Sequence, residues 1–359
     1  MEINDKVFKF TIRLVLALLI IYILIIGKSF LTPLAWAIVI GLASIQFIEK
    51  VKQKSKMPVG LIIMSYLLLI VAVLFMVFYF FYVELSHIIA DLPEINDKIS
   101  SSLHSISISL KDTGVHIPDH IDKNLINEWV DGHSDSIFGF ISGFGESLEH
   151  LVLGAVYLFF ILFYGDLIPQ FFESKIKNEK SREALKENTN KAISIIKSYI
   201  MGLLILALIT AVFVFIILLI LGVDYALFFA VLLGVLSLIP FIGNPIGMVI
   251  IGLFTFLTSD SLVTPLLAVG LIWVVNIIHE NVIRPILMGD RLQINAFVVF
   301  ISVIVGGLIW GVSGMILFIP LAGIIKVALM YSEETSHYAI LLGEKPKKEK
   351  RKRSKTGDK

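Results

Sequence analysis

The chain has 359 residues, of which 57% are hydrophobic and 16% charged, and its formal net charge is +1. Soluble domains are about 45–50% apolar and about 25% charged, so a water-soluble protein is excluded because it could not cover this much apolar surface. The absence of cysteine excludes disulfides and thiolate metal sites. The composition therefore indicates an integral membrane protein.

Six apolar stretches predict six full transmembrane helices, because a helical crossing needs roughly 20 mostly apolar residues. They are residues 9–27, 30–48, 58–83, 148–165, 199–221 and 262–284. The basic residues before the first stretch are also typical of a signal peptide, but no small-residue cleavage pattern follows, so we expect this helix to be retained. The predicted fold class is an all-α polytopic membrane protein.

The charges between these stretches predict the topology. Lysines in Glu49–Met57 and nine Lys or Arg from Lys345 onward place both segments in the cytoplasm by the positive-inside rule. Glu84–Glu146 holds eleven acidic residues against three lysines and is predicted outside. Asp166–Lys197, with seven basic and five acidic residues, returns inside and includes a predicted amphipathic helix over Pro169–Tyr199. We therefore expect a multi-pass protein of the plasma (cell inner) membrane with both termini cytoplasmic.

Two further apolar stretches, in the C-terminal half, are interrupted by glycine and proline. Leu227–Leu257 is broken at residues 239–247, and Ala296–Met330 is broken at residues 306–314. The arms are too short for full crossings, and irregular backbone at membrane depth is tolerated only where protein or a water-filled cavity covers it. Paired broken segments of this kind indicate the substrate site of a transporter. The break residues are Pro240, Gly243, Pro245, Gly247, Gly307, Gly311 and Gly314.

The charge pattern turns these two stretches in opposite directions. Helix 199–221 runs outward, whereas helix 262–284 runs inward because Arg284 and Arg291 flank its far end. The first broken hairpin then enters from outside and the second from inside, as in an inverted repeat. Two thin full crossings per stretch fit the same charges, although re-entrant hairpins are preferred. We expect the two tips to meet around a shared polar pocket.

These assignments divide the chain into five parts. Residues 1–83 hold the first three transmembrane helices, 84–147 form an extracytoplasmic, mostly helical insertion, 148–198 hold the fourth transmembrane helix and the cytoplasmic amphipathic helix, 199–332 form the inverted-repeat transport core, and 333–359 form a basic cytoplasmic tail. We interpret the basic residues of the tail as a topology determinant that also contacts anionic lipid headgroups, rather than as a nucleic-acid-binding segment. Histidines in the insertion lack metal-ligand spacing, since Pro118 separates His116 from His120. We expect no metal site and no cofactor.

Ionisable residues inside the membrane helices concentrate at residues 276–285, and such residues are functional-site hypotheses by default. Asn276, Glu280 and Arg284 form one stripe at helical spacing, with Glu280 and Arg284 in the favourable order for an ion pair. Pro285 cannot donate to the carbonyl of Asn281. Two roles are open: an ion, proton or solute site with Glu280 as the carrier, or a structural clasp near the cytoplasmic surface.

Three other polar or aromatic residues are weighed at or near the breaks. Asn244, between two prolines, is able to donate or accept a hydrogen bond in a cavity. Trp310 is expected either to gate or stack on a substrate, or to anchor at the bilayer interface. His279 lies off the stripe and is expected to pack or to lie at the interface.

Together these features predict a secondary transporter rather than an enzyme. No Walker motif for ATP and no His-Glu-x-x-His motif is present, and Gly165-Asp166 lacks the preceding glycine of an intramembrane protease signature. A passive channel or scaffold is the remaining class. The expected partners are the lipid bilayer and a small solute or a monovalent cation or proton.

In its C-terminal half the chain resembles the autoinducer-2 exporter (AI-2E) family. The matching segments are Ile239–Gly243, Glu280–Pro285, Met288–Leu292 and Val305–Gly311, followed by Gly314 and Pro320. The resemblance covers essentially the whole chain and implies a multi-pass transporter, in some relatives an exporter of a quorum-sensing furanone and in others a sodium(lithium)/proton antiporter. It also implies a homo-oligomer. The family's characteristic positions are Pro240, Gly243, Glu280, Asn281, Arg284, Pro285, Gly289, Gly307, Trp310 and Gly311.

Overall fold

The structure is a computed structural model that describes residues 2–91, 98, 149–165, 167–176, 178–259, 261–288, 294–330 and 335–343. Most of the predicted insertion, Gly289 and the basic tail lie outside the described residues. Within the described ranges every regular element is a helix, and one antiparallel bridge joins Ile294 to Gly343. The predicted all-α polytopic fold is confirmed.

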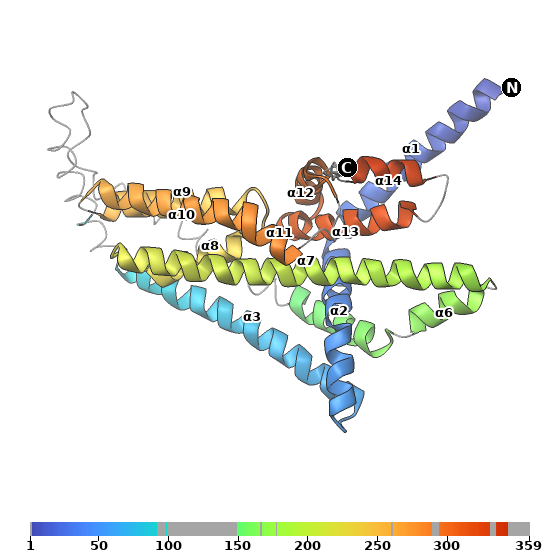
Figure 1. Cartoon of the computed structure of the whole chain (residues 1–359), viewed down its shortest axis with the longest axis horizontal. Coiled ribbons are helices and arrows are strands. Elements are labelled where there is room, and N and C mark those ends of the chain that lie inside the picture. Colours follow the sequence, from blue (N-terminus) through green and yellow to red (C-terminus); the bar gives the residue numbers. More distant parts are fainter. Residues whose placement is uncertain are drawn as a thin grey trace, which may run out of the picture.

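Three long apolar helices begin the chain: α1 (Glu2–Ile26), α2 (Lys28–Lys54) and α3 (Val59–Ala90). α1 projects from the rest of the molecule (Figure 1), and none of its apolar window is buried. α3 continues to Ala90 rather than ending at the predicted residue 83, because no glycine or proline interrupts it there. The described part of the fourth predicted crossing is the helix Glu149–Phe163, which packs against α2 and α3.

The predicted amphipathic helix over 169–199 is not a separate element. α6 (Leu167–Lys175) ends early, and α7 (Glu179–Ile220) then runs for 42 residues across the predicted domain boundary at 198/199. The Asn178 side chain accepts a hydrogen bond from Lys180 N and caps α7. No glycine or proline lies between Glu179 and Met201, so nothing stops the helix before its apolar half.

Both broken stretches fold as helical hairpins. The first consists of α8 (Ala226–Leu236) and α9 (Gly243–Thr258), and the second of α12 (Ala296–Trp310) and α13 (Val312–Met330). α8 has 11 residues and is therefore about 16 Å long, half the thickness of a bilayer core. α13 is long enough to cross, so within the described ranges it joins α1, α2, α3, α7 and α10 with η2 as a sixth candidate span.

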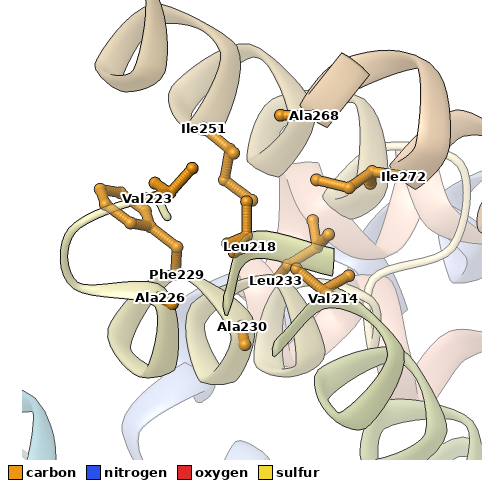
Figure 2. Packing of buried hydrophobic residues seen from close by; sticks show 10 residues of the cluster. All are labelled: Val214, Leu218, Val223, Ala226, Phe229, Ala230, Leu233, Ile251, Ala268 and Ile272. Carbon is orange, nitrogen blue, oxygen red and sulfur yellow. The ribbon is translucent and has the colours of Figure 1, made fainter. Parts of the chain in front are cut away.

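The remaining helices connect these hairpins. α10 (Val263–Ile278) passes into a π-helical turn, η2 (His279–Ile283), and then into α11 (Arg284–Met288), while α14 (Ser336–Leu342) follows the second hairpin. α7 lies along the middle of the molecule and contacts α2, α8, α10, α11, η2 and α13 (Figure 1). Figure 2 shows the apolar core in which α7, the first hairpin and α10 pack together. The chain therefore contains two successive units of helix plus hairpin, whose orientations in a bilayer stay a prediction.

The tip of the first hairpin packs against the second hairpin, and this contact is apolar. Leu238, Ile239 and Ile242 of the first tip pack in one cluster with Met315 and Ile316 of the second hairpin. The prediction of a polar pocket shared by both tips is therefore wrong for the described residues, because the polar cavity described below is lined only from α7, α8, α9, α10 and η2.

A buried tyrosine joins α7 to the second hairpin. Tyr199 Oη donates a hydrogen bond to the carbonyl oxygen of Ile316 over 3.0 Å. That carbonyl lacks its usual helical donor, because the residue four positions later is Pro320, which has no N–H. The tyrosine therefore satisfies a backbone acceptor that the helix itself leaves unpaired.

Trp310 fastens α1 to the second hairpin. Its side chain is 7% exposed, and its Nε1 donates to the carbonyl oxygen of Leu24 over 2.9 Å. This carbonyl lies in the last turn of α1 and has no acceptor role within that helix. The ring also makes an edge contact with Phe318, with 5.4 Å between centroids. Trp310 thus lies at the contact between α1 and the second hairpin, and it does not line the polar cavity.

Replacing Trp310 with phenylalanine should remove this hydrogen bond and part of the buried ring, destabilising the protein by at least about 1 kcal/mol. Thermal unfolding in detergent measures the change. The matched control is Trp273→Phe, at a position on α10 that is 57% exposed. Equal melting temperatures for the two variants would show that the Leu24 contact contributes nothing.

Candidate functional site

The backbone around the predicted ionisable stripe departs from a regular α-helix. In η2 the N–H of Arg284 donates to the carbonyl of His279, five residues earlier, which is the π-helical pattern. Pro285 follows directly and cannot continue the ladder to Asn281. Asn281 is exposed, and its Nδ2 donates to the carbonyl of Ile277 over 2.9 Å. Asn281 therefore supports this interrupted backbone.

The predicted ion pair between Glu280 and Arg284 is present. Arg284 Nη2 and Glu280 Oε1 lie 2.9 Å apart, and the two side chains are 19% and 34% exposed. Arg284 Nε has no hydrogen-bond partner among the described residues. This geometry supports the clasp role for Glu280, because a counter-charge already neutralises its carboxylate.

One turn away is a small buried cavity, which we call the polar chamber. Its polar lining is Thr210 of α7, Asn244 of α9, Asn276 of α10 and His279 of η2. Asn244 Nδ2 donates to Asn276 Oδ1 over 2.6 Å, and His279 Nδ1 lies 3.4 Å from Thr210 Oγ1. The free volume is about 10 Å³, room for roughly one water molecule.

Two polar atoms of the chamber are unpaired within the described structure: Asn244 Oδ1 and His279 Nε2. Both side chains are buried, at 9% and 1% exposure. Buried polar groups are normally hydrogen-bonded, so each such exception needs an explanation. An apolar wall surrounds the chamber, since Val214, Leu233 and Ile272 belong to the core in Figure 2.

The glycines of the first break allow Asn244 to reach this place. A Cβ at Gly243 would overlap the carbonyl oxygen of Leu236, and one at Gly247 would overlap the side chain of Leu233. Glycine at both positions therefore lets α9 fold tightly back on α8, and Asn244 begins α9 facing α10. At this tip Pro240 is buried and Pro245 is exposed.

The glycines of the second break pack its own hairpin. Gly311 has a φ of 63°, a left-handed conformation that glycine adopts readily, and it separates α12 from α13. A Cβ at Gly307 would lie 2.8 Å from Met315 Cε, and Gly314 lies against the backbone of Gly306. None of these residues lines the polar chamber.

The structure thus brings Asn244 and Asn276 together, with Glu280 and Arg284 nearby, and separates Trp310 and Asn281 from them. Sequence reasoning did not select Thr210, which is the single hydroxyl in residues 200–220 of α7 and has no local signal. It also set His279 aside, although His279 follows Asn276 at the i, i+3 spacing that shares a helix face. That spacing was the available signal.

A larger cavity of about 580 Å³ lies between α2, α3 and the helix Glu149–Phe163. Its lining is mainly apolar and includes Trp36 and Ser313, the latter next to the turn of the second hairpin. It shares no lining residue with the polar chamber.

A helical polytopic protein with a buried polar chamber at the tip of a broken hairpin has the features of a membrane transport protein. Residues 14–333 match the family described as AI-2E family transporter, which is most of the chain. The protein belongs to this family, and it is therefore a membrane transporter rather than an enzyme.

Three relatives illustrate the similarity. The protein named "Putative transport protein YhhT" of Escherichia coli (strain K12) is 28% identical over 256 residues, or 71% of each chain. A Haemophilus influenzae protein with a similar name is 38% identical over 140 residues, covering 39% of this chain and 40% of the relative. "AI-2 transport protein TqsA" of Escherichia coli (strain K12) is 22% identical over 262 residues, covering 72% and 74%.

Proposed function

We propose that the protein is a secondary transporter that exports a small, uncharged polar solute across the plasma membrane. The polar chamber is the observation that carries this proposal. It places two amides, an imidazole and a hydroxyl inside apolar helices, at the point where the first hairpin tip meets α10. Buried polar groups are costly in such surroundings unless they serve a bound partner.

The chamber favours a neutral solute. Its lining groups are hydrogen-bond donors and acceptors without a fixed charge, and the nearest charges, on Glu280 and Arg284, neutralise each other. A solute hydroxyl would engage Asn244 Oδ1 and His279 Nε2, which have no partner in the part of the chain that the structure describes.

The chamber as it stands is closed. With room for roughly one water molecule, it admits a solute only if the tip of the first hairpin moves away from α10. The hydrogen bond between Asn244 and Asn276, which we call the latch, is the polar contact that this movement breaks. Opening of the latch to one side or the other would give alternating access.

Autoinducer-2 is a suitable first test solute, because one relative is named an AI-2 transport protein. Purified protein would be reconstituted in liposomes loaded with autoinducer-2, and release would be measured with and without an imposed proton gradient. Asn276→Leu removes the chamber amide and should slow release at least roughly tenfold, the equivalent of about 1.4 kcal/mol of lost hydrogen bonding. The matched control is Asn190→Leu, at an exposed position of α7.

Four outcomes would contradict different parts of the proposal. No release above that from loaded, protein-free liposomes rules out autoinducer-2 as a solute, and a pH change driven by Na⁺ or Li⁺ would instead indicate antiport. Release that ignores every ion gradient would indicate a passive channel. Equal slowing by the Asn276 and Asn190 variants would remove the polar chamber from the pathway.

A further inference from the structure

We propose that His279, and not Glu280, binds the proton that couples this transporter to the proton gradient, and that the Asn244–Asn276 latch controls the access of water to His279. The inference rests on the proposed function, whose coupling it assigns to one side chain. Four observations about the polar chamber and its neighbours carry it.

Glu280 is poorly placed to carry the coupling proton. Its Oε1 lies 2.9 Å from Arg284 Nη2 on the same helical segment, so loss of its charge would leave the guanidinium uncompensated. Its side chain is also 34% exposed and does not line the chamber. A carrier must bind and release its proton from a place that the hairpin opens and closes.

His279 has the placement that Glu280 lacks. It is 1% exposed, lines the chamber beside Asn276, and has an Nε2 without a partner among the described residues. Histidine is also the side chain whose protonation changes most readily near neutral pH. Its position at the first residue of the π-helical turn η2 is a second, independent sign, because such turns are frequent at functional sites.

The charges around His279 are few. η2 packs against α7, α10 and α11. α8, α9, α10 and residues 200–220 of α7 contain no titratable residue, so the groups to weigh are Tyr199 of α7, Glu280 of η2 and Arg284 of α11. Glu280 neutralises Arg284, which is what allows a second positive charge to form nearby.

The proton step follows from these contacts. A proton adds to the ring nitrogen that carries none, which turns the imidazole into an imidazolium with two N–H donors. Thr210 Oγ1 and the unpaired Asn244 Oδ1 are the acceptors that the chamber offers. Because an unpaired charge is costly in an apolar interior, uptake from water accompanies opening of the latch.

The first test measures release of autoinducer-2 from proteoliposomes at about pH 5 and about pH 8, which bracket the titration of an unperturbed histidine. In the native protein the two rates should differ, whereas in His279→Asn or His279→Gln the ratio of the rates should fall to about one. His87→Asn, at an exposed position of α3, is the matched control and should keep the native ratio. In Glu280→Gln the dependence should persist but move to lower pH, because uncompensated Arg284 repels the added proton.

A second test does not depend on any solute. The histidines are labelled with ¹⁵N and followed by NMR in nanodiscs as the pH is lowered. The ring signal of His279 is assigned as the one that disappears in His279→Asn or that shifts in Thr210→Val. We expect the His279 ring to become protonated more readily in Asn244→Ala, whose latch is broken.

The two tests separate the possible failures. A His279 ring that titrates in nanodiscs, without release of autoinducer-2, leaves the inference standing and refutes only the solute. A ring that titrates identically in the native protein and Asn244→Ala overturns the role of the latch. A native pH ratio in both His279 variants overturns the assignment to His279.

Discussion

Alanine at Gly306 or Gly314 is expected to disrupt the second hairpin, lowering the melting temperature by several degrees and abolishing transport. A Cβ at Gly306 would overlap the carbonyl oxygen of Gly314, and a Cβ at Gly314 would overlap that of Gly306. Because the obstructing atoms belong to backbone, no side-chain rotation relieves the overlap, and α12 and α13 must separate. We expect a loss of about 3 kcal/mol, the upper part of the range for overpacked sites.

The matched control is Gly270→Ala on α10, where no atom lies within 4 Å of the added methyl group. There the substitution should be neutral or slightly stabilising, since alanine is the better helix former by roughly 1 kcal/mol. Thermal unfolding in one detergent compares the three variants. A Gly306 or Gly314 variant as stable as the Gly270 variant would show that close approach of the two backbones is not needed.

Tyr199→Phe should destabilise the protein by about 2 kcal/mol, although it removes a single oxygen atom. The hydroxyl donates to the carbonyl of Ile316, which Pro320 deprives of its helical donor, and Tyr199 is 2% exposed. In the variant the carbonyl is buried without any partner, and neither water nor a headgroup replaces the hydroxyl. Thermal or denaturant-induced unfolding measures the loss.

A double-mutant cycle isolates the mechanism. Pro320→Ala restores a backbone N–H that can donate to Ile316, so Tyr199→Phe should cost much less in that background. Tyr22→Phe is the control, because Tyr22 is 64% exposed on α1. If the loss at Tyr199 is the same with proline or alanine at position 320, the tyrosine acts by packing and not through this carbonyl.

Much of the helical architecture follows from local sequence, because helix formation and helix breaking depend on neighbouring residues. Uninterrupted apolar runs predict α1, α2 and α3, and Gly and Pro predict the breaks between α8 and α9 and between α12 and α13. The Glu280–Arg284 pair was predictable for the same reason, since four residues separate its members on one helix. Helix boundaries were predicted less well where no glycine or proline ends the helix. α3 therefore continues to Ala90, and α7 runs through the predicted boundary at 198/199.

The sequence by itself thus determined which segments are helices, where they break and which charges pair along one helix. Only the tertiary structure decided which helices meet. It brought Thr210, Asn244 and His279 into one chamber, and it joined Trp310 to Leu24 across 286 positions of the chain. The physical reason is that such contacts are set by the packing of several apolar helix faces, and one apolar face looks much like another in sequence. The role of a buried hydroxyl or imidazole depends on the side chains that tertiary packing places next to it.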